Sequence, residues 1–215
     1  MDVADAGRKG GVGKLRRPIV PNRVSTLLAR MDRTGRDPCG AAAEPLPVTI
    51  PKIDSATVGL LSGDDYGPAV AGYLAGASRS VEIAYYSIAA KWPKGRAEPL
   101  NLLRLLAEMP ARGITCTAVL AAHHKHGSTP GFNRVAGRIL AGAGWRLRWA
   151  KPSRLLHAKF ICIDGRTVIT GSHNLSWSAI SSNIDLSVVI EAPQTAAPFL
   201  DWFARLYSAS TKKAH

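Results

Sequence analysis

The residues of this 215-residue chain best suited to catalysis lie between His157 and Asn174, in the segment HAKFICIDGRTVITGSHN. Its lysine offers a compact positive charge for phosphate oxygens, and its serine and asparagine offer neutral hydrogen-bond donors. Its first histidine can act as a nucleophile or move a proton near neutral pH. This set suits the cleavage of a phosphodiester bond, and it needs no metal ion if its donors stabilise the developing charge.

Two apolar runs flank Asp164-Gly165, a dipeptide that favours a tight hairpin turn. Such a turn predicts three facing pairs: Ile163 with Arg166, Lys159 with Thr170, and His157 with Ser172. Because alternate side chains share one face of a strand, His157 and Lys159 point the same way, and the serine and asparagine can join them. Each residue alone would suit a solvent-facing edge hairpin, but a chance match of the whole spacing is very improbable.

The full spacing resembles the signature of the phospholipase D superfamily. The matching positions are His157, Lys159, Asp164, Gly171, Ser172 and Asn174. The resemblance implies a phosphodiesterase that forms a covalent phosphohistidine, with His157 as the nucleophile or its partner acid. It further implies that Lys159 and Asn174 hold the phosphate with help from Ser172. Asp164 and Gly171 would support the motif rather than react.

Many members of that superfamily carry Asn-x-Glu after the motif, and the glutamate orients the histidine. Here Asn183-Ile184-Asp185 stands in that place. The aspartate is one methylene shorter, but it can still hydrogen-bond an imidazole nitrogen in the manner of a triad. Asp185 is therefore a candidate for orienting His157, and the alternative is an aspartate that merely begins a strand.

The motif occurs once, whereas the superfamily mechanism uses two histidines. A two-fold homodimer supplies the second, because an isologous interface brings the same patch of each subunit together. Short single-motif members of the superfamily include sequence-nonspecific bacterial endonucleases. We therefore expect a homodimer that completes the active site.

The chain is strongly basic, with 28 Lys and Arg against 15 Asp and Glu, a formal net charge of +13. Such a charge attracts polyanions and favours DNA or RNA as substrate, although a basic host proteome would give the same balance. No cofactor is expected. Three cysteines without regular spacing argue against disulfides and zinc. The sequence shows neither a membrane-length apolar run nor a signal peptide, so we expect a cytoplasmic protein.

The composition and the periodicity of the sequence change near residue 50. Residues 1–50 are predicted to form a basic, disordered tail, with one short helix possible at 23–31. Residues 51–211 are predicted to form the catalytic domain, of α/β class with the phospholipase D-like nuclease fold. Alternating strands and helices predict a mixed, largely parallel sheet with helices on both faces. The expected strands are 57–63, 80–89, 114–121, 145–150, 159–164, 167–171 and 183–192, and the expected helices are 66–78, 100–109, 132–143 and 198–208.

Two further clusters are candidates for substrate contact. One is a possible substrate rim on a loop after a predicted strand, formed by His123, His124, Lys125 and His126. No carboxylate or cysteine accompanies these residues, so a metal site is not favoured. The other alternates aromatic and basic residues from Trp145 to Trp149. It suits either a binding surface or a strand whose tryptophans lie in the core.

Three functions compete on these observations. The first is a metal-independent nuclease, favoured by the basic charge and the single motif. The second is a phospholipase D acting on phosphatidylcholine-type lipids, which requires an apolar substrate mouth. The third is a non-catalytic nucleic-acid-binding member of the fold, which the intact motif disfavours.

Overall fold

The computed structural model describes residues 55–90, 101–122, 130–151 and 155–212, without the side chains at 130–132 and 193–195. The expected tail at 1–50, the possible helix at 23–31 and the cluster at 123–126 lie outside these ranges. The division into a tail and a catalytic domain over 51–211 therefore stays a prediction.

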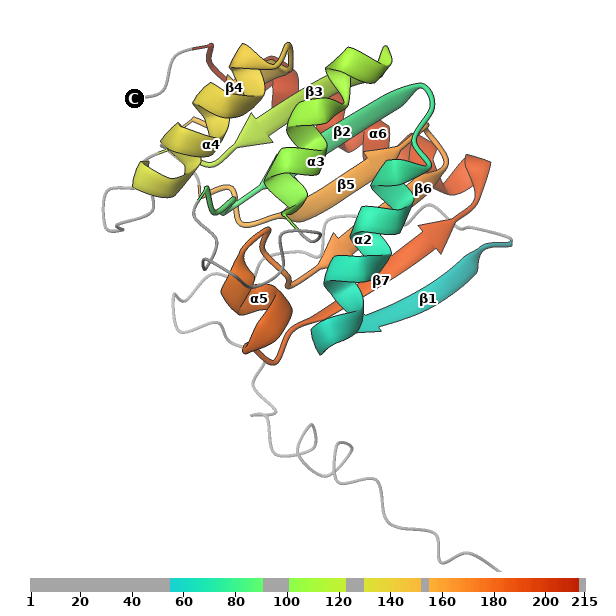
Figure 1. Ribbon diagram of the computed structural model, residues 1–215. Helices are drawn as coiled ribbons and strands as arrows, with labels where there is room; N and C mark the ends of the chain where they lie inside the picture. Colours follow the sequence, from blue (N-terminus) through green and yellow to red (C-terminus); the bar gives the residue numbers. More distant parts are fainter. Residues whose placement is uncertain (1–54, 91–100, 123–129, 152–154, 213–215) are drawn as a thin grey trace, which may run out of the picture. The chain divides into compact units, whose positions relative to one another are not determined.

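The described residues form one seven-stranded sheet in the order β1-β7-β6-β5-β2-β3-β4 (Figure 1). The strands are β1 (Thr57–Ser62), β2 (Ser80–Tyr85), β3 (Thr115–Leu120), β4 (Arg146–Trp149), β5 (Lys159–Ile163), β6 (Thr167–Gly171) and β7 (Leu186–Glu191). The helices are α2 (Tyr66–Ala75), α3 (Leu102–Glu108), α4 (Pro130–Gly142), α5 (Trp177–Ser181) and α6 (Pro193–Ala209), with short 3-10 turns at Gly63–Asp65 and Pro110–Arg112.

The mixed α/β class is confirmed, but the sheet is less parallel than the sequence predicted. Only β2–β3 and β3–β4 pair in parallel, while β1–β7, β7–β6, β6–β5 and β5–β2 are antiparallel. The first half of the domain follows the expected strand–helix alternation. From β4 at the sheet edge the chain crosses back past β3 and β2, and β5 pairs with β2 in the antiparallel direction.

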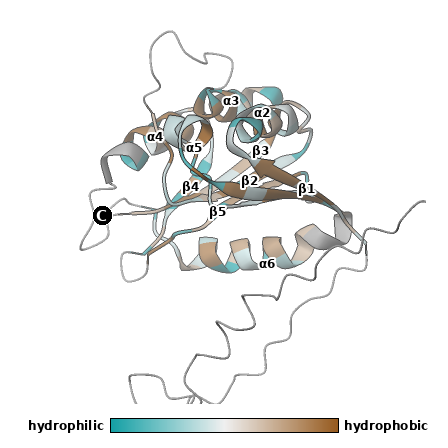
Figure 2. Ribbon diagram, turned by 90° about the horizontal axis from the view of Figure 1, so that it is seen from below, coloured by the Kyte–Doolittle hydropathy of each residue, from teal (hydrophilic) through white to brown (hydrophobic). Residues whose placement is uncertain are grey.

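Helices cover both faces of the sheet, as predicted. Figure 2 shows α2, α3, α4 and α5 on one face and α6 on the other. The larger core lies under α2–α4 and includes Val70, Leu106 and Ile161, while Phe160 and Phe203 belong to the core under α6. Because both faces are covered, all five residues of β5 are buried, including the polar Lys159.

Local sequence signals explain where most helices begin and end, but the closing helix and α5 differ from prediction. The closing helix begins at Pro193 instead of Pro198, because a proline in the first turn loses no helix hydrogen bond. Pro198 lies inside the helix. The five-residue α5 was not predicted, since it is too short to show a helical period. The Ser176 side chain accepts from the Ala179 N–H at its start. Measured for length and hydropathy, the helices that the structure describes all fall short of a membrane span.

Candidate active site

The β5–β6 hairpin carries the candidate motif, and its register differs from the prediction by one residue. The Arg166 N–H donates to the Ile163 carbonyl at 3.0 Å, so the expected tight turn is present. Asp164 and Gly165 both have positive φ, as a type I′ turn requires. However, Ile163 pairs with Thr167, because the Arg166 carbonyl accepts from the Ala192 N–H instead. Lys159 consequently falls opposite Gly171 rather than Thr170, and Ser172 reaches the site only because β6 ends before it.

His157 and Lys159 are in contact at the open end of the hairpin. The Lys159 Nζ atom donates to the His157 carbonyl oxygen at 2.8 Å and lies 3.2 Å from each nitrogen of the His157 ring. Equal distances place the ammonium over the ring face, so the in-plane lone pair of the ring stays available to a substrate. Tyr86 packs on both groups, with its ring centroid 4.8 Å from that of His157 and 5.1 Å from Lys159 Nζ.

These contacts set the protonation of the pair. Burial of the ring by its neighbours lowers the pKa of His157 below 6.5, and the Lys159 ammonium lowers it further. Burial also lowers the pKa of Lys159, which is only 5% exposed, while the Asp185 carboxylate raises it. A lowered histidine pKa keeps the imidazole neutral at pH 7, and this is the form that can attack phosphorus.

Asp185 lies at the start of β7 and is tied to the motif through Ser172. The Ser172 hydroxyl donates to Asp185 Oδ1 at 2.6 Å and accepts from the Leu186 N–H at 2.9 Å. Asn183 donates to the other carboxylate oxygen at 3.1 Å. Within the described ranges, the hydrogen bonds of Asp185 come from these two side chains and not from His157. Its role as the orienter of the histidine thus stays a prediction.

Asn174 sits on a segment held against the extension of β2. The Ala89 N–H donates to the Leu175 carbonyl at 2.8 Å, and the Leu175 N–H donates to the Ser87 carbonyl at 3.2 Å. The Asn174 Oδ1 atom is buried and accepts no hydrogen bond from a described residue. An unpartnered buried amide oxygen is costly in a finished core, so its presence here marks a polar position that is left incomplete.

A buried polar network, which no pattern in the sequence indicates, lies at this end of the hairpin. His173 is fully buried, stacks on Tyr66 with centroids 4.1 Å apart, and hydrogen-bonds Ser187 Oγ through Nδ1 at 2.8 Å. Tyr66 and Tyr85 share a hydrogen bond of 2.8 Å between their hydroxyls. Tyr85 is the register partner of Lys159 on β2, so this network lies beneath the lysine. Burial raises the pKa of both tyrosines, which therefore stay neutral.

Asn133 is a second positioning residue that sequence reasoning missed. Its amide nitrogen donates to the carbonyls of Tyr86 and Ala121 at 2.8 and 3.0 Å, and its oxygen accepts from the Ile88 N–H at 2.9 Å. The fully buried side chain thereby joins α4 to the ends of β2 and β3. The only sequence signal was a polar residue among the apolar positions of that helix.

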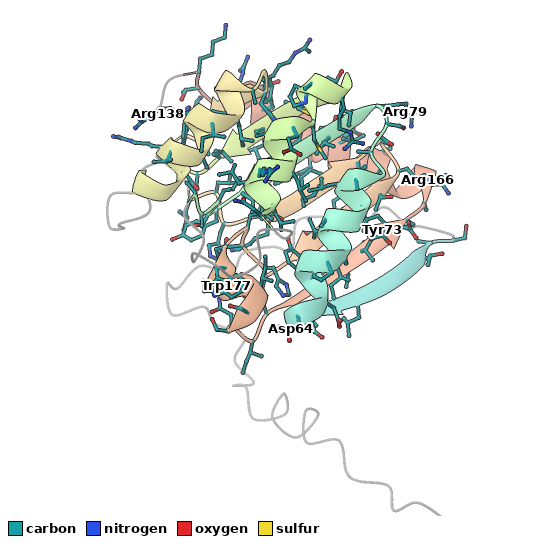
Figure 3. The ribbon with its side chains drawn as sticks, viewed as in Figure 1. Asp64, Tyr73, Arg79, Arg138, Arg166 and Trp177 are labelled. Carbon is teal, nitrogen blue, oxygen red and sulfur yellow. The ribbon has the colours of Figure 1, made fainter. Side chains whose placement is uncertain are left out.

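Asp164 lies at the opposite end of the hairpin and binds backbone. Its carboxylate accepts from the N–H groups of Ser78, Arg79 and Ser80 at 2.7 to 3.2 Å, and from the Ser78 hydroxyl at 2.9 Å. Figure 3 shows Arg79 and Arg166 at this same end of the sheet. Burial raises the pKa of Asp164, but the hydrogen bonds lower it more, leaving it below 3.8. This geometry is that of a supporting residue.

Gly171 is required by the packing of β6 on β7. A Cβ atom at this position would overlap the Leu186 carbonyl oxygen and the Cα and Oγ atoms of Ser187. The absence of a side chain therefore lets the segment after β6 approach Ser187 and Asp185. The structure thus gathers His157 with Lys159 and Ser172 with Asp185, with Asn174 on the adjoining segment. Asp164 lies at the turn end of the hairpin and Gly171 packs against Ser187, and their supporting role stays a prediction.

A family model described as "Cardiolipin synthase, PLD-like domain" matches residues 70–207. This covers more than half of the chain, so the chain belongs to this PLD-like family and hence to the phospholipase D superfamily. The matched range includes every motif residue considered above.

Known proteins show partial likeness to the chain. The mitochondrial cardiolipin hydrolase of Danio rerio is 38% identical over 72 residues, 33% of this chain and 32% of that protein. The corresponding protein of Chlamydomonas reinhardtii is 34% identical over 65 residues, 30% of this chain and 29% of that protein. The chain therefore matches about a third of the length of these curated relatives.

Two solved structures share the fold. Nuc from Salmonella typhimurium, a phospholipase D family member, has a TM-score of 0.61 at 24% identity and covers 75% of this chain and 99% of its own. NucT from Helicobacter pylori has a TM-score of 0.55 at 15% identity and covers 73% and 99%. The two structures support the fold, and the family match supports a phosphodiesterase of the phospholipase D superfamily.

Proposed function

We propose that the chain is a phosphodiesterase that cuts DNA or RNA as a metal-independent endonuclease through a covalent phosphohistidine. The observation that carries this proposal is the contact of the exposed His157 ring with the buried Lys159 Nζ atom, where burial and the lysine lower the pKa of the histidine. The imidazole nitrogen attacks phosphorus while the ammonium stabilises the phosphoryl oxygens. Water then attacks the phosphorus, breaks the P–N bond and leaves a phosphate monoester with free histidine.

The first step needs an acid to protonate the oxygen that leaves phosphorus. Because the motif occurs once in the sequence, we propose a homodimer in which one His157 attacks in its neutral form while His157 of the partner subunit is protonated and supplies this proton. The homodimer is testable by sedimentation, because a strictly monomeric active enzyme would contradict it. The net charge of +13 supports nucleic acid as the substrate, and the likeness to Nuc is consistent with it. A cytoplasmic location stays a prediction, and the two curated relatives are called mitochondrial.

A lipid phosphodiesterase is the second candidate, and one observation favours it. Leu155, Ile184 and Leu186 are 45%, 106% and 54% exposed and lie within two residues of His157 or Asp185. Exposed apolar side chains beside a reacting group can receive an acyl chain. The family model and the curated relatives are named for cardiolipin, which makes cardiolipin the lipid to test beside phosphatidylcholine.

One experiment separates these functions. Plasmid, single-stranded DNA, RNA, and vesicles of cardiolipin or phosphatidylcholine are incubated with wild type and His157→Ala, each with and without EDTA. Arg166→Ala, at the exposed turn of the same hairpin, is the matched control. We expect nucleic acid to be cut in EDTA by wild type and Arg166→Ala only. Cutting by His157→Ala would refute the phosphohistidine, loss of cutting in EDTA would refute metal independence, and lipid cleavage alone would favour the second candidate.

A further inference from the structure

A basic groove lies at the β4 edge of the sheet, apart from the catalytic hairpin. Its volume is about 470 Å³, and its lining includes three cations, Arg134, Arg138 and Lys212, above the indoles of Trp145 and Trp149. Among the described residues that line it, none is an aspartate or glutamate. Both tryptophans are buried, at 4% and 7% exposure, while the three cations are exposed. The groove therefore offers an anion a positive rim over a packed aromatic floor.

Specific contacts fix the shape of this groove. Trp149 and Thr211 exchange two backbone hydrogen bonds, of 2.7 and 2.8 Å, which hold the C-terminal segment with Lys212 against β4. On the other side, a Cβ atom on Gly137 would come within 2.8 Å of the Trp149 indole. The glycine thus lets α4 sit close over the tryptophan. Arg134 and Arg138 lie about 6 Å apart along the axis of α4, on one side of the helix.

The register of the sheet places the groove in line with the catalytic lysine. Trp149 pairs with Leu120, Leu120 pairs with Tyr85, and Tyr85 pairs with Lys159, so these four residues form one row across β4, β3, β2 and β5. Paired residues point to the same face of a sheet, and Tyr85, Leu120 and Trp149 all belong to the core under α2–α4. Three strand spacings separate the ends of the row, about 14 Å.

We infer that this groove binds the sugar–phosphate backbone of a nucleic-acid strand whose neighbouring segment occupies the active site. The inference rests on the proposed nuclease function and adds to it a second contact region. At a rise of about 3.4 Å per nucleotide, a strand needs roughly four nucleotides to span the 14 Å. Substrates longer than this engage both regions, whereas a shorter substrate engages the active site alone.

An anionic membrane is the competing occupant, because α4 also exposes Val135 and Ile139, at 43% and 41%. Two features favour the nucleic-acid strand. The cations line a concave groove instead of a flat face, and the tryptophans that would enter a bilayer are buried beneath them. Vesicle binding is therefore one arm of the test.

The test compares two double variants that each remove two exposed cations. Arg138→Ala with Lys212→Ala changes the groove, while Arg166→Ala with Arg205→Ala changes the β5–β6 turn and α6 on the far face of the sheet. Figure 3 shows Arg138 and Arg166 at opposite ends of the molecule. Binding of labelled dT3 and dT12 is measured by anisotropy in an inactive His157→Ala background over a range of salt, after circular dichroism confirms folding. Vesicles containing cardiolipin are tested alongside.

We expect the groove variant to bind dT12 about tenfold more weakly and to lower the salt slope by about 1.4, since each lost phosphate contact removes about 0.7. Binding of dT3 and hydrolysis of bis(4-nitrophenyl) phosphate by the variants that retain His157 should match wild type. The inference that the groove binds the strand would be contradicted by unchanged dT12 binding, by an equal loss in the control variant, or by an equal loss for dT3. A loss confined to vesicles would contradict it as well. If groove-dependent binding of dT12 is found but no nucleic acid is ever cut, the proposed function fails while the groove stands.

Discussion

At one end of the β5–β6 hairpin, the Asp164 carboxylate accepts hydrogen bonds from three successive backbone N–H groups and a hydroxyl. At the other end, the Asn174 Oδ1 and His173 Nε2 atoms are buried without partners among the described residues, and a buried ammonium lies against a neutral imidazole. Satisfied polar groups stabilise a fold, whereas unsatisfied ones cost free energy unless a ligand completes them. The two ends of the hairpin thus differ, because the polar groups of the turn end are satisfied whereas the open end, where the proposed chemistry lies, keeps two buried polar atoms without described partners.

The largest expected effect belongs to the open end. His157→Ala should lower the rate of phosphodiester cleavage by at least about 10³-fold, because it removes the proposed nucleophile. Its unfolding free energy should change by no more than about 0.5 kcal/mol, since the side chain is exposed. Cleavage of plasmid and thermal unfolding measure the two quantities. A variant that unfolds at a clearly lower temperature than wild type, or that keeps a tenth of wild-type activity, would contradict this expected difference between the two ends of the hairpin.

The turn end should show the reverse behaviour. Asp164→Asn keeps a side chain that tolerates positive φ but removes the charge, and it should lower the unfolding free energy by about 1–2 kcal/mol. The melting temperature should fall by several degrees, while the rate per folded molecule stays near wild type. Asp201→Asn, on an exposed position of α6, is the control. Full loss of activity in a folded Asp164→Asn protein would place Asp164 in the chemistry.

A smaller effect concerns the pKa of His157. Lys159→Met removes a positive charge that disfavours the imidazolium, so the pKa of His157 should rise toward 6.5. The change is measured by NMR titration of labelled histidine, with Arg166→Ala as a control that leaves the pKa in place. A fall, or no change, would show that the ammonium does not set the protonation of the ring.

The smallest effect is the pH dependence of the Asp164 contribution. The pKa of this carboxyl in the folded protein lies below 3.8, the value expected in the unfolded chain, so folding favours the charged form. The contribution is present in full above the unfolded value and is lost as pH falls through the folded one. The melting temperatures of wild type and Asp164→Asn should therefore converge below pH 3.8. A constant difference down to pH 2 would contradict this.

The sequence predicted the elements well where contacts are local. The alternation of apolar runs located the seven strands, and Asp164-Gly165 located the hairpin turn. It did not predict the features that depend on residues distant in the sequence. The one-residue shift in register arises because Arg166 bonds to Ala192, and the antiparallel entry of β5 depends on its pairing with β2. Neither interaction has a signature within the hairpin itself.

The candidate site was predictable in its residue types but not in its support. The spacing of the motif selected His157 and Lys159, which lie two residues apart in the sequence at the start of β5. The motif did not predict the stacking of His173 on Tyr66. His173 occupies a variable position of the motif, and Tyr66 lies on a helix more than 100 residues earlier in the sequence. Nor did the motif find Asn133, whose partners lie just after the ends of β2 and β3.

The hydrogen bonds of Asp164 also bear on how the protein folds. A hairpin of this size forms within about 1–10 μs by itself, but its carboxylate meets Ser78 and Ser80 across 86 and 84 residues of chain. Contacts so distant in sequence form slowly, because the intervening loop must first be closed. The strand that carries Lys159 is completed only when β2 has joined it. Recovery of catalysis during refolding should therefore follow the last, global phase of folding and not the first.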